Sequence, residues 1–213
     1  MDKNLQVIIK KRVDKVIDAL EKNNMDGYFV CDEKEAIEKI KEICHEGETV
    51  AVGGSISLAE VGVLDLLRNG KYNFLDRYEE GLTPEQIDDV CRKSLFADTF
   101  FTGSNAITEE GFLYNVDGKG NRVAAMLYGP KKVVVVVGIN KIVSNLEEAE
   151  VRMQKIAAPA NCVRLNRTNP CTVKGECMNC SSKTRICNLY TVIKRQMTKG
   201  RISVIIVNKQ LGY

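Results

Sequence analysis

Four cysteines in the last quarter of the chain have the residue type and spacing of a metal site. They follow the pattern Cys171-x5-Cys177-x2-Cys180-x6-Cys187. Four thiolates can complete the coordination sphere of zinc or hold an iron–sulfur cluster. Structural zinc sites usually pair two short knuckles, and here only Cys177 and Cys180 have that spacing, so the pattern favours a 4Fe–4S cluster. Zinc, and free thiols without any metal, stay open as alternatives.

Polar turns that contain glycine form a second group of candidate functional residues. Gly53 and Gly54 follow an apolar segment, and Ser55 or Ser57 can cap the helix that comes next. Such a junction brings backbone N–H groups to the positive end of a helix dipole, where phosphate or carboxylate binds. A plain strand-to-helix turn is the alternative interpretation. Two later turns supply the other candidates for ligand binding: Gly103, Ser104, Asn105, Asn115, Gly118 and Asn121.

Two carboxylates beside these turns are the candidate catalytic residues. Glu60 lies one turn into the helix after Gly54, and Asp117 precedes Gly118. A carboxylate facing a bound ligand can act as a general base. The alternatives are a solvated surface acid for Glu60 and a turn-forming residue for Asp117. His45 is the single histidine, so the sequence gives no support for a histidine-based triad or a multi-histidine metal site.

The longest apolar run predicts the element that positions these turns. Val133 to Val137 are five consecutive valines, closed by Gly138. A run of β-branched residues without polar alternation is typical of a strand buried on both faces of a parallel sheet. Predicted strands and helices alternate along the chain, which indicates a three-layer α/β domain with a mostly parallel sheet. Because ligands gather at the carboxyl ends of such strands, we expect the polar turns to converge on one site for a small anion, a carboxylate or a phosphate.

Local patterns predict several further elements. Thr83, Pro84 and Gln86 predict a capping-box helix start. A second capping box at 144–147 predicts a helix to about residue 157, and the helix with Leu58 at its start is expected to extend to Leu67. Residues 124–128 are predicted to form a strand, and residues 185–197 a helix.

Length and composition limit the class of protein. The chain has 213 residues, of which 44% are hydrophobic and 28% charged, as expected for a single globular domain over residues 1–213. Residues 1–25 are predicted to form a helical element whose apolar face is compatible with a homodimer, and residues 168–190 a small cysteine-rich insertion. A formal net charge of +3 is too small to indicate a nucleic-acid partner. We also expect no membrane insertion and a cytoplasmic protein, since no apolar run approaches the roughly 18–20 residues that span a bilayer.

Three segments resemble the LUD-domain family, the lactate-utilisation proteins. They are GGSISLAEVG at 53–62, TGSNAITEEGFLYNVDGKGNRVAAMLYGP at 102–130, and the cysteine block. The resemblance implies a fold like that of ribose-5-phosphate isomerase and coenzyme A transferases. It also implies a redox-associated subunit in lactate or organic-acid oxidation, with other lactate-utilisation subunits as partners. Since such systems include iron–sulfur subunits, the resemblance adds support for a cluster.

The middle segment also resembles the methylthioribose-1-phosphate isomerase and initiation-factor-2B group. In that group the position of Asn105 is commonly an aspartate that acts on a sugar phosphate. Asparagine cannot act as a general base, so this departure argues against sugar isomerase chemistry. A stand-alone isomerase or transferase acting on a sugar phosphate or an acyl-CoA is one alternative function. The other alternative function is a non-catalytic binding protein whose cysteine segment is held together by zinc.

Overall fold

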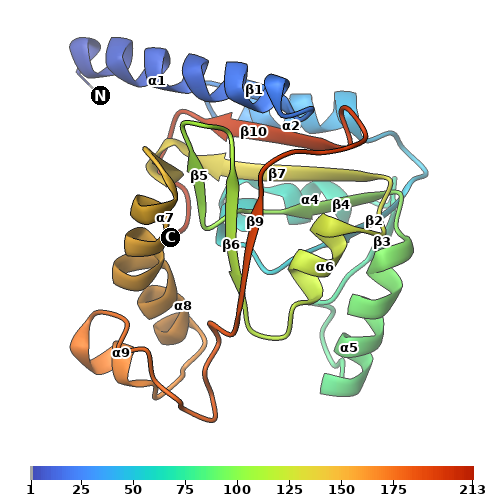
Figure 1. The fold of residues 1–213 in the computed structure, drawn as a ribbon. Helices are drawn as coiled ribbons and strands as arrows, with labels where there is room; N and C mark the ends of the chain where they lie inside the picture. Colours follow the sequence, from blue (N-terminus) through green and yellow to red (C-terminus); the bar gives the residue numbers. More distant parts are fainter. Residues whose placement is uncertain (1) are drawn as a thin grey trace.

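The computed structural model of the chain describes residues 2–213 and is built around a six-stranded sheet (Figure 1). Every neighbouring pair of strands in this sheet is parallel. In spatial order the strands are β1 (Asp26–Val30), β10 (Ile202–Val207), β7 (Lys132–Gly138), β4 (Thr99–Thr102), β2 (Thr49–Val52) and β3 (Asn73–Leu75). The predicted mostly parallel sheet is confirmed.

The valine strand is the centre of the hydrophobic core. Strand β7 pairs with β10 on one side and β4 on the other, and all five valines are inaccessible to solvent. Because side chains alternate across a strand, Val133, Val135 and Val137 face one apolar cluster, while Val134 and Val136 face the other. The prediction of a strand covered on both faces is therefore confirmed.

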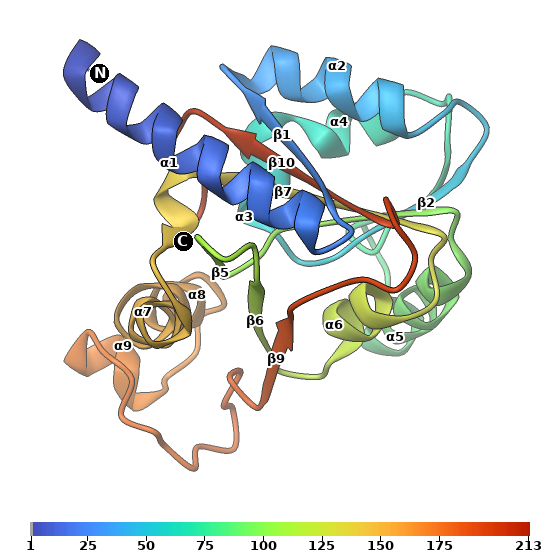
Figure 2. The same cartoon turned by 45° about the horizontal axis from the view of Figure 1, so that its top comes forward.

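Helices cover the two faces of the sheet and complete the three layers. Helix α1 (Lys3–Lys22) and helix α6 (Asn121–Leu127) pack on the face of Val135. Helices α2 (Glu33–Ile43), α3 (Ile56–Val61) and α4 (Val63–Leu67) pack on the opposite face, as Figure 2 shows for α1 and α2. Helix α5 (Pro84–Lys93) begins with the predicted capping box of Thr83 and Gln86. Among residues 2–213, no helix combines the length and the apolar character that a bilayer crossing requires.

A second, smaller sheet runs across the direction of β7 and β10 (Figure 1). Its strands, in spatial order, are β8 (Ile142–Val143), β5 (Ala106–Thr108), β6 (Leu113–Asp117) and β9 (Leu189–Ile193). Tyr114 of β6 packs in a third apolar cluster with Ala149 and Met153. Those residues belong to the C-terminal helical region, which comprises α7 (Leu146–Arg152), a π-helical turn at Met153–Ala157, α8 (Ala158–Arg164) and α9 (Pro170–Lys174).

Four local predictions are wrong. Residues 124–128 lie mostly in α6, because alanine, methionine and leucine are strong helix formers. The predicted helix at 185–197 contains β9, whose sequence LYTVI has aromatic and β-branched strand formers. The predicted helix to Leu67 is interrupted by Gly62, which adopts a left-handed φ of 83°. The N-cap of α7 is Asn145, one residue after the predicted position, and Glu148 accepts the Ser144 N–H.

Candidate functional site

Three turns meet at the carboxyl ends of β2 and β4. The turn after β2 supplies Gly54 and Ser55, the turn after β4 supplies residues 103–105, and the connection from the end of β6 to the start of α6 supplies residues 117–119 and 121. Together they line an open cavity of about 350 Å³. The structure thus brings together the polar turns that the sequence predicts to converge.

Most of the predicted site residues line this cavity. These are Gly54, Ser55, Gly103, Ser104, Asn105, Asp117, Gly118 and Asn121. Ser55 is the N-cap of α3, where its hydroxyl accepts the Leu58 N–H at 3.3 Å. Ser104 is buried, and its hydroxyl donates to the carbonyls of Ala106 and Tyr114 at 2.9 and 3.1 Å. These two hydroxyls therefore hold the turns in place.

The other four predicted residues lie outside the cavity lining. Gly53 is buried, and a Cβ there would lie 2.9 Å from Cγ of Arg122, so the missing side chain makes room for that arginine. Asn115 is fully buried. Ser57 is also fully buried and donates to the Leu211 carbonyl at 3.3 Å. Glu60 is exposed and accepts the Gly212 N–H at 2.7 Å.

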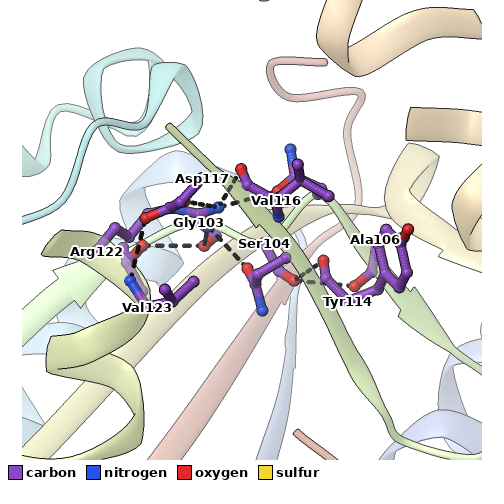
Figure 3. A network of polar contacts seen from close by, with 11 residues as sticks. Gly103, Ser104, Ala106, Tyr114, Val116, Asp117, Arg122 and Val123 are labelled. Atoms are coloured by element: carbon purple, nitrogen blue, oxygen red, sulfur yellow. Dashed lines mark hydrogen bonds and ion pairs between the residues drawn. The ribbon is translucent and has the colours of Figure 1, made fainter. Parts of the chain in front are cut away.

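Arg122 of α6 connects these turns and was not predicted from the sequence (Figure 3). Its Nε donates to Asp117 Oδ1 at 2.8 Å, and its Nη1 donates to the Gly103 carbonyl at 2.9 Å and to Asn115 Oδ1 at 2.7 Å. Its Nη2 donates to Asn105 Oδ1 at 3.0 Å and to the Val116 carbonyl at 3.2 Å. A guanidinium has five N–H donors in a fixed fork, and this one is occupied by the protein. Arg122 therefore positions the site.

Asp117 is the carboxylate partner of this arginine. Both side chains are buried, with 10% exposure for Arg122 and 8% for Asp117. The second carboxylate oxygen of Asp117 accepts the Val123 N–H at 3.2 Å. An ion pair with both oxygens engaged anchors the loop to the start of α6, and this leaves Asp117 poorly placed to remove a proton from a ligand.

The cavity lining is strongly basic. Of the lining residues that the structure describes, six are lysine or arginine and one is acidic, namely Asp117, which is paired with Arg122. The basic residues are Arg77, Lys119, Arg122, Lys141, Arg164 and Arg167. Arg77 stacks over the ring of Tyr78 with Cζ 5.6 Å from the ring centroid, and its buried Nε has no hydrogen-bond partner among residues 2–213. A concave surface with charges of one sign concentrates counter-ions, so this cavity suits an anion.

Lys141 is the most buried lysine of the lining. It ends the short 3-10 turn Ile139–Lys141, which follows β7, and it is 4% exposed. Burial, and then the positive charges of Arg152 and Arg122, lower the pKa of Lys141 to about 7, while the carboxylate of Glu60 acts in the opposite direction. The sequence did contain a signal for Lys141. It lies shortly after the valine strand, and ligands bind at the carboxyl ends of the strands in a parallel sheet.

A second cavity of about 340 Å³ is lined by residues of α2 and α4 and by the segment before β3. Its charged side chains are paired, Lys71 with Glu46 at 2.6 Å and Lys41 with Glu38 at 2.7 Å. It lacks the excess of unpaired positive charge that distinguishes the strand-end cavity.

The cysteine segment has a different arrangement. Cys171 and Cys187 are buried, whereas Cys177 and Cys180 are partly exposed. Within residues 2–213, no three cysteine, histidine or acidic side chains are gathered as a metal ion requires. Burial raises the pKa of Cys171 to about 11 and also raises that of Cys187, so both are neutral thiols near neutral pH. Cys180 lies near Cys171 and Cys177 near Cys187, but they do not form the ligand set of a 4Fe–4S cluster or a zinc ion, so metal binding there stays a prediction.

The comparison with protein families now adds to this geometry. The sequence model of the LUD domain family matches residues 13–207. The chain belongs to the LUD domain family. The match includes the three strand-end turns, Arg122 and Lys141 of the cavity, and the cysteine segment, so the strand-end cavity is formed mainly by the LUD domain itself.

Solved structures support the same fold. The crystal structure of a DUF162 family protein from Deinococcus radiodurans superposes with a TM-score of 0.53 at 17% identity, covering 94% of this chain and 98% of that one. At this identity the likeness shows the fold. The eIF2B beta structure from Chaetomium thermophilum (TM-score 0.37, 14% identity, 53% and 43% coverage) and its eIF2B delta structure (0.35, 21%, 53% and 48%) are too distant to carry an argument. No curated protein matches the chain.

Proposed function

We propose that this LUD domain protein binds a small anionic ligand, a carboxylate or a phosphate, in the cavity at the strand ends. The observation that carries the proposal is the excess of basic side chains in the cavity: two of the six are ion-paired, Arg122 with Asp117 and Lys119 with Asp88, and the other four form no ion pair among residues 2–213. Charge-assisted hydrogen bonds from lysine and arginine are the strong contacts for such ligands. The three converging turns supply the polar backbone around them.

The resemblance to lactate-utilisation proteins makes a small organic acid the preferred ligand class. In this proposal the chain serves lactate or organic-acid oxidation as a redox-associated subunit, next to other subunits of the system. The volume of about 350 Å³ lies at the lower end of typical ligand sites, which suits a ligand of a few carbon atoms.

The alternative, an isomerase or transferase for a sugar phosphate or acyl-CoA, has less support. Its candidate base Asp117 is held by Arg122 and Val123, and Glu60 lies outside the lining. A titration panel that includes sugar phosphates and CoA esters tests it, because a ligand of this class that binds much more tightly than lactate would favour the alternative.

Thermal unfolding with lactate, phosphate and lactamide tests the proposal. A ligand that binds the folded state raises the melting temperature with concentration. We expect lactate or phosphate to stabilise the protein, whereas lactamide, which has nearly the shape of lactate without its charge, has little effect. Equal stabilisation by lactamide, or none by either anion, would contradict an anion site.

The iron–sulfur cluster needs a separate test, since among residues 2–213 no three cysteines form a metal-ligand set. Protein purified without oxygen should be brown and contain iron and acid-labile sulfide if the segment binds a cluster. Colourless protein with one zinc per chain would support the zinc-stapled alternative, and metal-free protein would leave the thiols free.

A further inference from the structure

Lys141 differs from the other basic residues of the cavity. It lines the cavity and is almost fully buried. Of the residues that the structure describes, none accepts a hydrogen bond or forms an ion pair with its ammonium group, in contrast to Lys119, which pairs with Asp88 at 2.8 Å. Its Nζ is not sealed off from solvent, so the amine keeps access to the cavity.

The backbone that carries Lys141 is held firmly. Asn140 Oδ1 accepts the Leu211 N–H at 3.0 Å, and its Nδ2 donates to the Gly212 carbonyl at 3.2 Å. A Cβ on Gly138 would overlap the backbone of Lys209 and Leu211, so glycine allows this close approach at the end of β7. The lysine therefore projects from a fixed turn at the end of the central strand.

The groups around Lys141 favour its neutral form. Arg152 of α7 is fixed by bonds to the Asn140 carbonyl at 3.1 Å and the Asn105 carbonyl at 2.7 Å. Arg122 of α6 is fixed by the contacts described above, and Glu60 of α3 is the one acid that acts against them. With a pKa of about 7, about half of the molecules carry a free amine at neutral pH. A buried amine beside other cations is the arrangement that activates lysine as a nucleophile.

We propose that Lys141 is a nucleophile that captures a 2-oxo carboxylate in this cavity as an imine. The inference rests on the proposed function, since the carboxylate of the ligand must be held there, and Arg164 and Arg167 offer the charges for it. The neutral amine attacks the C2 carbonyl carbon and forms a C–N bond, which gives a carbinolamine. The C–O bond then breaks, and the oxygen leaves as water with the two hydrogens of the amine, leaving a C=N bond. No oxidant or reductant takes part.

Borohydride trapping with pyruvate tests this proposal on the full chain. Reduction of the imine fixes a secondary amine, which adds the mass of pyruvic acid less one oxygen atom. We expect this increase in the intact mass, and peptide mapping should place it on Lys141. The Lys141→Gln variant should lose the adduct, whereas Lys131→Gln, which removes an exposed lysine outside the cavity, should keep it. An adduct distributed over other lysines, or none, would overturn the proposal.

Two further measurements separate this inference from the proposed function. Lactate has a hydroxyl group at C2 and no ketone that could form an imine, so stabilisation by lactate without trapping of pyruvate would overturn the imine and leave the anion site standing. No stabilisation by lactate or phosphate would overturn the anion site itself. Since mapping of the wild-type adduct places it on Lys141 or elsewhere, the test does not depend on the folding of the variant.

Discussion

The strand-end cavity and the cysteine segment differ in how the fold arranges side chains that could bind a ligand. The cavity residues come from separate parts of the chain, between Gly54 and Tyr213, and still meet because the strands of a parallel sheet end at one edge. The cysteines are close in the sequence, within residues 171–187, and lie near one another in the fold, Cys180 near Cys171 and Cys177 near Cys187, but among residues 2–213 no three of them form a metal-ligand set. Short spacing thus brings side chains into one region, whereas the ends of the strands bring distant residues together around one cavity.

The difference extends to the charge state of the two regions. In the cavity lining, Arg122 is held in place by Asp117, and Arg152, which lies near Lys141 outside the lining, is held by backbone carbonyls. In the cysteine segment, burial keeps Cys171 and Cys187 protonated, whereas a metal ligand must be a thiolate. The cavity holds fixed positive charges without a ligand, whereas the thiols of the cysteine segment would become negatively charged only on losing protons to a metal.

The largest expected effect comes from removing the residue that holds the cavity together. Arg122→Ala leaves the buried Asp117 carboxylate without its partner, and breaking a buried pair in this way costs about 3–5 kcal/mol. Urea unfolding should show this loss, whereas Arg92→Ala, at an exposed position of α5, should change the free energy of unfolding little. A loss below about 1 kcal/mol would mean that the network does not hold the turns.

The pH dependence of stability tests the state of Lys141. Because its pKa is lowered in the folded protein to about 7, the unfolded chain binds more protons above this pH. The free energy of unfolding of wild type, compared with Lys141→Gln, should therefore rise with pH. The rise should be about 1 kcal/mol from pH 7 to pH 8 and continue toward the pKa of an ordinary lysine. Parallel profiles for the two proteins would show that Lys141 is an ordinary lysine.

A smaller effect is expected for one arginine of the rim. Arg167→Gln removes a charge from the cavity lining, and a charge-assisted hydrogen bond contributes about 1.5–3 kcal/mol. The Kd for lactate or phosphate should rise roughly tenfold or more, and Arg92→Gln serves as the matched control. Calorimetric titration measures both variants. If the two substitutions weaken binding equally, the effect comes from net charge and the anion does not contact Arg167.

The smallest effect is expected in the cysteine segment. Cys177 and Cys180 are partly exposed, and the Cys177 sulfur accepts one long hydrogen bond, from the Asn179 N–H at 3.4 Å; the bond from the Cys177 N–H to the Gln154 carbonyl at 2.8 Å belongs to the backbone and survives the substitution. In protein without metal, the Cys177→Ser and Cys180→Ser variants should change the free energy of unfolding by less than about 0.5 kcal/mol. If these variants lost several kcal/mol in free energy of unfolding when purified without oxygen, the result would reveal a bound metal. The cysteine segment would then be a binding site, as is proposed for the cavity.

The fold could be predicted from the sequence because its strongest signals are local. The valine run indicates a strand buried on both faces, and Thr83, Pro84 and Gln86 indicate a helix start; both are confirmed. Where short apolar segments lacked a clear period, at 124–128 and 189–193, the predicted element type was wrong.

The candidate site was predictable in its location but incompletely in its residues. The turns at Gly54, Gly103 and Asp117 were identified because glycine and short polar residues follow predicted strands. Arg122 was missed because an arginine at a helix start usually lies in solvent, and its burial depends on three turns that meet only in the folded chain. Lys141 was missed although it follows a predicted strand end, since the sequence does not show its burial or the neighbouring Arg152.

A crystal structure of the protein grown with lactate tests the central claim most directly. The proposed anion site predicts that the lactate carboxylate lies in the strand-end cavity, within hydrogen-bond distance of Lys141 or of the arginines at positions 164 and 167. Lactate bound elsewhere, or an unoccupied cavity in protein for which calorimetry shows binding, would contradict it.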